Sequence, residues 1–471
     1  MIGRDKEKQE LLDAYRSNHS EFVAVYGRRR IGKTFLVRET FGDRFLFQHS
    51  GNSHSPMEKQ LDAWFISLKN SGWKGDKKPE TWLDAFFILN ELVKSSRKRR
   101  KVIFIDEMPW MDTPRSFFVA ALEYFWNNLA SARKDVLLVV CGSATSWIIN
   151  KVIKNHGGLH NRVTRQIHLQ QFSLNECERY ARSIGAAFDR YAIVKGYMVF
   201  GGVPYYWSLM NKSYSIDQNV DNLIFNPSGR LHDEFNELYD SLFRSPDEYI
   251  KIVTVLGQKK VGMTREELIA KGKITNNGKL SRILGDLEYC GFVRKYRAFK
   301  SVQYKAIYQL MDNFTLFYFK FMQENKTNDS AFWTHSLDTP IYNAWCGLAF
   351  ERVCFQHVEQ LKCALGISGI KTDVYAWQSE VSAGTSKSQI DMVIDRADHV
   401  ANLCEMKFSD EKYKLTKSDD TKLRQKRNAL HEALPKQKSI YLTMITPYGI
   451  LRNAYANNIQ GEVSVNKLFV F

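Results

Sequence analysis

The stretch EFVAVYGRRRIGKTFLVRETF, residues 21–41, decides the fold of the first part of this chain. Its apolar run FVAVY is typical of a buried strand, and a helical pattern begins after the glycine-rich loop that follows. The loop GRRRIGKT, residues 27–34, has the spacing G-x-x-x-x-G-K-[ST] between a strand and a helix, which predicts a phosphate-binding loop. Its glycines allow backbone N–H groups to curl around phosphate oxygens, and the start of the helix adds its positive end.

Two side chains of this loop have separate tasks in the predicted nucleotide site. Lys33 supplies a positive charge to the β- and γ-phosphates, and the Thr34 hydroxyl coordinates Mg²⁺. We therefore expect ATP and Mg²⁺ as cofactors. The nucleotide is expected to lie against nine consecutive residues: Gly27, Arg28, Arg29, Arg30, Ile31, Gly32, Lys33, Thr34 and Phe35.

A second apolar run, KVIFIDE at residues 101–107, ends in two carboxylates. Its four apolar residues suit a parallel strand buried on both faces, and ligands of open α/β sheets bind at the carboxyl ends of such strands. Asp106 is predicted to hold Mg²⁺ through water, and Glu107 to be the base that orients the attacking water, which favours hydrolysis over binding alone. A third run, DVLLVVCGSATS, ends in Ser143 and Thr145, which either sense the γ-phosphate or simply form a turn.

Length and composition set broader bounds. With 471 residues, 44% hydrophobic and 25% charged, the chain is ordinary globular material of about two to four domains. It starts without an apolar signal segment, and no apolar run approaches the roughly 18 residues that span a bilayer, so we expect a cytoplasmic protein without a membrane partner. Seven cysteines without a CxxC pair favour a reduced protein and no zinc site. The formal net charge of +16 favours nucleic acid, with DNA as the first candidate, as a partner.

The first half of the chain resembles the archaeal-type ATPases, which sit beside the AAA+ and STAND groups of P-loop NTPases. The segments that carry the resemblance are IGRDKE, GRRRIGKT, FIDE, CGSATS and GGVP. It implies an AAA-like parallel sheet with a helical lid, in which Gly3 and Arg4 lie near the nucleotide. Gly202 and Pro204 of GGVP would close over the adenine, although a turn that starts a helix explains the same residues. Arg162, or its neighbour Arg165, is the candidate arginine finger, and a solvated surface arginine is the alternative.

The middle of the chain is predicted to form a winged helix-turn-helix. EYIKIVTVLGQ reads as a helix, MTREELIAKG opens with a Thr264–Glu267 capping box, and NGKLSRILGDLEYCG is a third helix. FVRKYRAF and QYKAIYQL then read as two strands. Such a module either contacts DNA or serves as a packing lid. The basic residues that would face DNA are Lys279, Arg282, Arg294, Lys295 and Arg297.

Near the end of the chain, charges lie inside otherwise apolar strands. The hairpin QIDMVIDRADHVANLCEMKF spans residues 389–408, and its Asp391 and Glu405 are 14 positions apart, as suits neighbouring strands. Strand side chains alternate between faces, so Glu405 and Lys407 are expected on one face of the second strand. On the first strand, Ile390, Met392 and Ile394 are expected on one face and Asp391 on the other. The helix IYNAWCGLAFERVCFQHVEQL before the hairpin places Glu351 beside an apolar stripe of Phe350, Val353, His357 and Leu361.

This order of a helix Glu, a strand Asp and a strand Glu-x-Lys resembles the PD-(D/E)XK nuclease fold. The resemblance implies that Asp391 and Glu405 hold a metal together with the Met406 carbonyl, that Glu351 completes the site, and that Lys407 activates water or stabilises charge on the phosphate. The usual proline before the aspartate is absent, because the sequence reads Gln389-Ile390-Asp391. The basic helix after the hairpin would track a DNA backbone or form a solvated face; its cations are Lys422, Arg424, Lys426 and Arg427.

We therefore expect three parts: a P-loop ATPase core with a helical lid (residues 1–235), a winged helix (236–312) and an α/β restriction-endonuclease-like domain (313–471). The leading hypothesis is a Mg²⁺-dependent ATPase that controls a nuclease-like domain acting on nucleic acid. The alternative is a STAND-like switch that binds DNA or a protein partner and carries an inactive nuclease-like domain. A homo-oligomer or a protein trigger fits either hypothesis.

Overall fold

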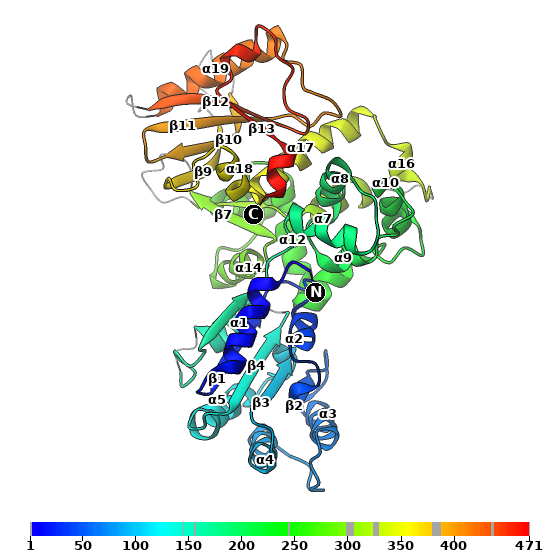
Figure 1. The fold of residues 1–471 in the computed structure, drawn as a ribbon, viewed down its shortest axis with the longest axis vertical. Coiled ribbons are helices and arrows are strands. Elements are labelled where there is room, and N and C mark those ends of the chain that lie inside the picture. The colour runs from blue at the N-terminus through cyan, green and yellow to red at the C-terminus, as the bar shows by residue number, and fades with distance from the viewer. Residues whose placement is uncertain are drawn as a thin grey trace. The chain divides into compact units, whose positions relative to one another are not determined.

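The computed structural model describes residues 2–143, 145–154, 157–243, 245–297, 306–323, 329–378, 388–434 and 438–470 (Figure 1). It contains two compact units. Unit 1 comprises residues 1–171, 240–244 and 281–291, and unit 2 comprises residues 172–239, 245–280 and 292–471. The three-part division at residues 235 and 312 follows motifs rather than contacts, and it stays a prediction.

Unit 1 is built on a five-stranded parallel sheet in the order β2-β3-β4-β1-β5. The predicted α/β fold with a parallel sheet is therefore confirmed for this part of the chain. Its strands are β1 (Glu21–Tyr26), β2 (Phe45–Ser50), β3 (Lys101–Asp106), β4 (Val136–Gly142) and β5 (Arg165–His168). Its helices are α1 (Asp5–Arg16), α2 (Lys33–Phe41), α3 (Met57–Asn70), α4 (Trp82–Ser95), α5 (Phe118–Tyr124) and the short α6 (Thr145–Trp147).

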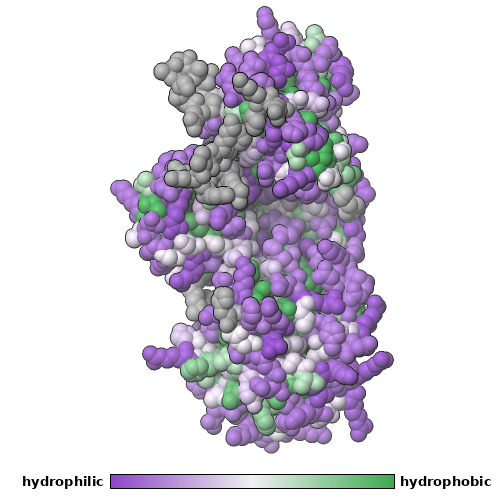
Figure 2. Space-filling model, turned by 90° about the vertical axis from the view of Figure 1, so that its left-hand side faces the viewer, coloured by the Kyte–Doolittle hydropathy of each residue, from purple (hydrophilic) through white to green (hydrophobic). Residues whose placement is uncertain are grey.

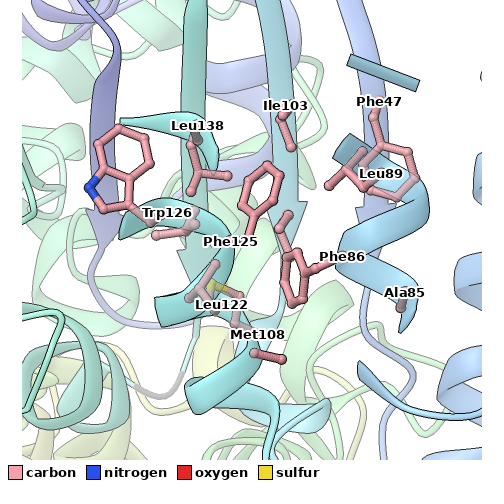
Figure 3. Packing of buried hydrophobic residues seen from close by; sticks show 14 of the residues in the cluster. Phe47, Ala85, Phe86, Leu89, Ile103, Met108, Leu122, Phe125, Trp126 and Leu138 are labelled. Carbon is pink, nitrogen blue, oxygen red and sulfur yellow. The ribbon is translucent and has the colours of Figure 1, made fainter. Parts of the chain in front are cut away.

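The central strands of unit 1 are buried on both faces because their residues alternate between two hydrophobic cores. Phe22 and Ala24 of β1 belong to a core that includes α3, α4 and α5, whereas Val23 and Val25 belong to a core that includes α1 and α2. Figure 3 shows part of the first core, where Phe86 and Phe125 pack between Ile103 and Met108. A sheet covered on both faces leaves its strand ends as the places where polar groups collect.

Unit 2 begins with helices and then forms a small antiparallel sheet in the order β6-β8-β7. The predicted strands FVRKYRAF and QYKAIYQL include residues 298–299 and 303–305, which lie outside the described residues. The side chain of Arg297 also lies outside the described part of the chain. The capping box of Thr264 and Glu267 is present at the start of α13. The elements of this part of the chain are α7 (Leu174–Ser183), α8 (Arg190–Phe200), α9 (Pro204–Ser208), α10 (Ile216–Val220), α11 (Glu234–Leu242), α12 (Pro246–Gly257), β6 (Met263–Thr264), α13 (Arg265–Gly272), α14 (Gly278–Tyr289), β7 (Val293–Arg297), β8 (Ala306–Leu310), α15 (Asn313–Phe317) and α16 (Phe332–His335). Residues 240–242 of α11 and 281–289 of α14 belong to unit 1.

The last part of unit 2 is a five-stranded mixed sheet in the order β13-β12-β11-β10-β9. Strands β9, β10 and β11 are antiparallel to one another, while β11, β12 and β13 run parallel. In Figure 1, α19 lies on one side of this sheet and α18 on the other. The elements are α17 (Pro340–Gln356), α18 (Val358–Ala364), β9 (Thr372–Gln378), β10 (Gln389–Arg396), β11 (Val400–Met406), α19 (Lys417–Ala433), β12 (Ser439–Thr446) and β13 (Gly461–Ser464).

Two local expectations for this region need correction. A β-bulge shifts the register of β10 against β9 between Ile390 and Val393, and these two residues pack in the same hydrophobic cluster. Strict alternation along Ile390, Met392 and Ile394 is therefore wrong, because a bulge adds one residue to one strand of a pair. The single helix predicted over residues 341–361 ends instead at Gln356 and restarts at Val358, although its predicted apolar stripe is buried.

No helix among the described residues is long and apolar enough to cross a membrane. The face shown in Figure 2 is mostly hydrophilic, with apolar residues in small scattered patches. Most of the groups presented to solvent on that side are therefore polar or charged.

Candidate nucleotide site and a second carboxylate site

The phosphate-binding loop has the backbone that its glycines predict. Gly27 and Gly32 have φ values of 142° and 88°, in the region that favours glycine. A Cβ atom on Gly27 would lie 2.4 Å from the Leu169 carbonyl oxygen, so no larger residue fits there. Lys33 begins α2, and its Nζ donates to the carbonyl oxygens of Gly27 at 2.9 Å and Arg28 at 2.8 Å. The lysine thus holds the loop in a curled conformation.

The two residues predicted to serve Mg²⁺ lie together at the carboxyl end of the sheet. The Thr34 hydroxyl donates to Asp106 Oδ2 at 2.5 Å, and Asp106 is only 3% exposed. A hydroxyl beside a buried carboxylate, at the start of a helix that follows a glycine-rich loop, is an oxygen donor set that suits Mg²⁺. The residues present therefore fit the metal that the resemblance implies.

Glu107 is held by Ser143 across two neighbouring strands. The Ser143 hydroxyl and backbone N–H both donate to Glu107 Oε2, at 2.8 Å and 3.1 Å. Glu107 itself has φ 48°, an uncommon conformation for a residue with a side chain. The sequence predicted that both residues lie at this edge of the sheet, and the contact between them fixes the direction of the carboxylate.

The entry segment of the chain also reaches the phosphate-binding loop. Arg4 Nη2 donates to the Ile31 carbonyl oxygen at 3.3 Å and to the Gln170 carbonyl oxygen at 2.7 Å. Gly3, directly before it, has φ 67°. Arg4 therefore contacts the backbone of the loop, and the predicted position of this segment beside the nucleotide stays a prediction.

The other residues predicted for the nucleotide site have different surroundings. Arg28 is buried and Phe35 is 56% exposed, and the Arg162 backbone N–H donates to the Leu159 carbonyl while its side chain is exposed. Arg165 starts β5, where its Nη2 lies 3.6 Å from Glu21 Oε1, at the amino end of the sheet rather than the carboxyl end. Arg162 therefore remains the candidate finger, and that role stays a prediction.

The GGVP element belongs to unit 2. Pro204 is the first residue of α9, so the turn that starts a helix is present as one of the two interpretations had it. Position 202 requires a glycine because the backbone there lies close to residue 172. A Cβ atom at this position would lie 1.8 Å from the Phe172 carbonyl oxygen. Closure of this element over adenine stays a prediction.

Sequence reasoning missed a set of residues around the end of β1. The Tyr26 ring stacks on His168 with ring centres 4.8 Å apart, and Lys154 lies 3.4 Å from the Tyr289 hydroxyl. Burial raises the pKa of Cys290 to about 11, although a hydrogen bond with Thr145 opposes this. No motif points to these contacts, because residues 281–291 join unit 1 only in the folded chain.

A second site lies in unit 2, where the four residues predicted for a nuclease come together. Glu351 extends from α17, Asp391 from β10 and Glu405 from β11, and all three are buried at 7–9% exposure. The register pairs Met392 with Cys404, and Asp391 and Glu405 are the next residues of β10 and β11 beyond that pair. The Met406 N–H lies 3.5 Å from Asp391 Oδ2, and Lys407 Nζ lies 2.9 Å from Glu405 Oε1.

Two lysines that the sequence did not single out for this site also bind its carboxylates. Lys426 of α19 donates to Glu405 Oε2 at 2.6 Å, so it faces the sheet and not a passing DNA backbone. Lys260, from the loop between α12 and β6, lies 2.5 Å from Glu351 Oε2 and 3.4 Å from Asp391 Oδ1. Local sequence offers no signal for these pairs, because the partners are 21, 91 and 131 positions apart.

Burial and charge shift the pKa values of this cluster in opposite directions. Burial, and then the charge of Asp391, raise the pKa of Glu351 to about 7 despite Lys260. Burial, and then Glu405, also raise the pKa of Asp391. Burial acts in the same direction on Glu405, but Lys426 and Lys407 outweigh it and lower the pKa of that carboxyl. Like charges that crowd a buried site in this way favour the binding of a cation.

Whether this site can hold a metal depends on the lysine side chains that already bind its carboxylates. Among the described residues, no group of three or more His, Cys, Asp or Glu side chains is placed to hold a metal ion. The carboxylates of Glu351 and Asp391 are instead bridged by the Lys260 ammonium. The donors therefore suit a hard divalent ion in chemistry, whereas their arrangement is that of an ion-pair cluster.

A cavity of about 370 Å³ opens beside Glu351 and Asp391. Its apolar wall includes Trp345, Leu348 and Phe355, and its charged lining includes Arg352. The Arg352 Nε and Nη2 atoms are buried without a hydrogen-bond partner among the described residues. Burial lowers the pKa of Arg352 to about 10, so the guanidinium stays charged at neutral pH.

Comparisons with known proteins agree with the fold of the first part of the chain. Residues 1–209 match the family model described as an ATPase domain predominantly from Archaea. The uncharacterized protein MJECL04 of Methanocaldococcus jannaschii is 23% identical over 381 residues, which cover 76% of this chain and 77% of that protein. The Walker-type ATPase paby2304 of Pyrococcus abyssi is 15% identical, with a TM-score of 0.50, over 68% of this chain and 96% of its own.

A weaker likeness is to the ORC2 protein of Aeropyrum pernix in its ADPNP–ADP complexes. It is 12% identical, with a TM-score of 0.41, over 76% of this chain and 96% of that one.

The family match spans the phosphate-binding loop, Asp106, Glu107 and Ser143, which the structure brings to one end of the parallel sheet. Residues 1–209 are therefore an ATPase domain of the archaeal type.

Proposed function

We propose that this chain is a Mg²⁺-dependent ATPase that controls a nuclease-like site acting on nucleic acid. The observation that carries the proposal is the convergence of Glu351, Asp391, Glu405 and Lys407 on one buried site in a chain that also has an ATPase domain. These residues come from a helix, two strands and the residue after a strand, so chance proximity along the sequence does not explain the cluster.

The order of elements around the site supports this proposal. Helix α17 precedes three antiparallel strands, β9 to β11, and helix α19 then leads to β12, which runs parallel to β11. This is the order expected for a restriction-endonuclease-like domain with its acidic residues on the second and third strands. The connection from β11 to β12 through α19 is the crossover that a parallel pair requires.

The side chains supply the groups that phosphodiester hydrolysis needs. In that reaction a water oxygen bonds to phosphorus, the P–O bond to the leaving oxygen breaks, and the leaving oxygen takes a proton. A bound Mg²⁺ would lower the pKa of the water and offset charge on the phosphate. Asp391 and Glu405 would hold the metal with the Met406 carbonyl, Glu351 would complete the set, and Lys407 would stabilise the negative charge that grows on the phosphate.

Nucleic acid is the substrate class that the charges favour. The net charge is +16, and Lys422 and Arg424 of α19 are exposed near the site. Arg352 lines the cavity and has two guanidinium nitrogens without a hydrogen-bond partner among the described residues, so it would bind a phosphate of the same strand. Contact of the predicted winged helix with DNA would add further phosphate contacts, which makes binding dependent on salt.

The remaining assignments belong to the same proposal. ATP binding through residues 27–35 would be the switch, and hydrolysis through Glu107 would reset it. Arg162 would act as a finger on a neighbouring copy of the chain, which requires a homo-oligomer, or else a protein trigger would take that part. Gly202 and Pro204 would close the lid over the base of the nucleotide.

A cleavage assay tests the proposal directly. Supercoiled plasmid and single-stranded DNA are incubated with Mg²⁺ or Mn²⁺, with and without ATP. We compare the wild type with Glu405→Gln, which removes one charge at nearly constant volume, and with Glu432→Gln, a matched change at an exposed position of the same domain. Cleavage that is lost in Glu405→Gln and kept in Glu432→Gln supports the nuclease.

A regulatory switch is the second candidate, and the lysines of the carboxylate site favour it. Glu351, Asp391 and Glu405 are all paired with Lys260, Lys407 or Lys426, an arrangement that also suits a structural cluster. In that case the domain binds DNA or a protein partner without cutting. Absence of cleavage under every condition, with ATP hydrolysis intact, decides for this candidate and against the nuclease.

A further inference from the structure

Lys260 forms ion pairs with both Glu351 and Asp391. Its Nζ lies 2.5 Å from Glu351 Oε2 and 3.4 Å from Asp391 Oδ1, and the two carboxylates are only 12% and 11% exposed at the side chain. The lysine comes from the loop between α12 and β6, in the part predicted to be a winged helix. The carboxylates come from α17 and β10, about 90 and 130 positions later in the chain.

The position of this ammonium group conflicts with metal binding. Buried carboxylates that repel each other are stabilised by one cation between them, and two cations a few ångströms apart repel in turn. An ammonium that bridges Glu351 and Asp391 therefore competes with a divalent ion for the same oxygens. A divalent ion that binds Asp391 must therefore offset the repulsion from the ammonium or displace it.

We propose that Lys260 is an internal cation that closes the carboxylate site, and that a divalent metal binds there only when the lysine side chain moves away. This inference rests on the proposed function of the site, because it takes Asp391 as a metal ligand. The proposal assigns to the loop between α12 and β6 the control of that site.

The structure gives Lys260 the freedom to move while its backbone stays in place. Its side chain is 36% exposed and lines the cavity of about 370 Å³, so the ammonium has space and solvent to enter. The Lys260 carbonyl oxygen accepts a hydrogen bond from Gln309 Nε2 of β8 at 2.7 Å, and the Tyr296 hydroxyl of β7 donates to the next carbonyl, that of Val261. A rotation of the side chain alone is therefore enough to open the site.

Neighbouring lysines do not share this position. Lys259 lies 2.6 Å from Glu267 Oε1, on the helix that follows the loop. Lys407 and Lys426 both bind Glu405. Lys259 thus offers a matched control: the same residue type in the same loop, paired outside the carboxylate site.

The test is Mn²⁺ binding to nucleotide-free protein, measured by the loss of the electron paramagnetic resonance signal of free Mn²⁺. The proposal expects Lys260→Met to bind Mn²⁺ at least about tenfold more tightly than the wild type, which corresponds to about 1.4 kcal/mol of competing interaction removed. Lys260→Arg and Lys259→Met should bind as the wild type does, and Asp391→Asn should abolish the gain in the Lys260→Met background.

The outcomes separate this inference from the proposed nuclease. If Lys260→Met and the wild type bind Mn²⁺ equally and both lose it with Asp391→Asn, the metal site is real and the role of Lys260 is wrong. If no variant shows binding that depends on Asp391, the metal site and the role of Lys260 fall together. Thermal unfolding of each variant shows whether it is folded.

A second measurement uses the unaltered protein, so it does not depend on the folding of a variant. Acetylation of Lys260 by an N-hydroxysuccinimide ester is followed by mass spectrometry with and without saturating Mn²⁺. Binding of Mn²⁺ should release the Lys260 ammonium from the carboxylates. It should therefore raise the rate of acetylation at Lys260 and leave the rate of acetylation at Lys259 unchanged. An equal rate at Lys260 under both conditions, with Mn²⁺ bound, would overturn the proposal.

Discussion

Glu107 and Ser143 are the pair on which the rate of ATP hydrolysis is expected to depend. Two hydrogen bonds from Ser143 to Glu107 Oε2 fix the carboxylate, and a general base must point at the water that it orients. Only one of these bonds comes from the hydroxyl, so removal of the hydroxyl leaves the backbone N–H in place. We therefore expect Ser143 to orient the proposed base, Glu107, and not to replace it.

Glu107→Gln should lower kcat for ATP about a hundredfold and leave the dissociation constant for ATP unchanged, because the amide cannot accept a proton. Ser143→Ala should lower kcat by a smaller factor, about tenfold. Phosphate release gives kcat, and a fluorescent ATP analogue gives the affinity. A wild-type rate in Ser143→Ala would show that the contact has no part in hydrolysis.

At the scale of elements, His357 connects the end of α17 to the start of α7. Its Nδ1–H donates to the Val353 carbonyl at 2.8 Å, and its Nε2 accepts from the Leu174 N–H at 3.0 Å. The ring is 1% exposed, and burial lowers the pKa of His357 to about 4 from its ordinary value of 6.5. These bonds require the neutral ring and coincide with the break between α17 and α18.

The stability of the wild type should therefore fall in acid. The unfolded chain takes up a proton near pH 6.5 and the folded protein does not, so the contribution of His357 is complete above pH 6.5 and is lost as the pH falls toward 4, by roughly 3 kcal/mol. His357→Gln keeps a donor and an acceptor but does not titrate. The difference in unfolding free energy between the two proteins, measured by urea from pH 7 to 4.5, should shrink by this amount. A constant difference would contradict the prediction.

Two glycines of unit 2 should respond in opposite directions to alanine. Gly347 lies inside α17, and apart from its chain neighbours and the backbone of its own helix no described atom lies within 4 Å of the position that an added methyl group would take. Gly347→Ala should therefore stabilise the unit by up to about 1 kcal/mol. At Gly202 the same methyl would meet the Phe172 carbonyl oxygen, so Gly202→Ala should destabilise it by about 1–3 kcal/mol. Urea unfolding measures both, and a loss of stability in Gly347→Ala would contradict the argument.

At the scale of the whole molecule, any effect of ATP on the carboxylate site is expected to require ATP binding at Lys33. Lys33 Nζ binds two loop carbonyls in the structure and would transfer its charge to the phosphates of ATP. Lys33→Ala should therefore lose ATP binding and any effect of ATP on DNA cleavage, while ATP-independent cleavage remains. Normal ATP binding by this variant would refute both proposed functions.

The sequence by itself predicted the features that depend on neighbouring residues. The loop of residues 27–34 predicted a strand, a turn and a helix, the apolar run before Asp106 predicted a strand buried on both faces, and the run before Ser143 predicted a strand. Local patterns predict such elements because backbone conformation and burial follow from the residues along one segment. The order Glu351, Asp391 and Glu405-x-Lys407 likewise predicted a shared site, since hairpin strands pair by position.

Only the tertiary structure decided how charges pair between distant segments. It bound Lys260 and Lys426 to the carboxylates, placed Arg165 on Glu21, broke the predicted helix at His357 and introduced the bulge in β10. Residues 281–291 also joined unit 1 although the chain before them belongs to unit 2. An ion pair depends on which elements pack together. The order of residues along the chain does not give the distance between two charged side chains from different elements.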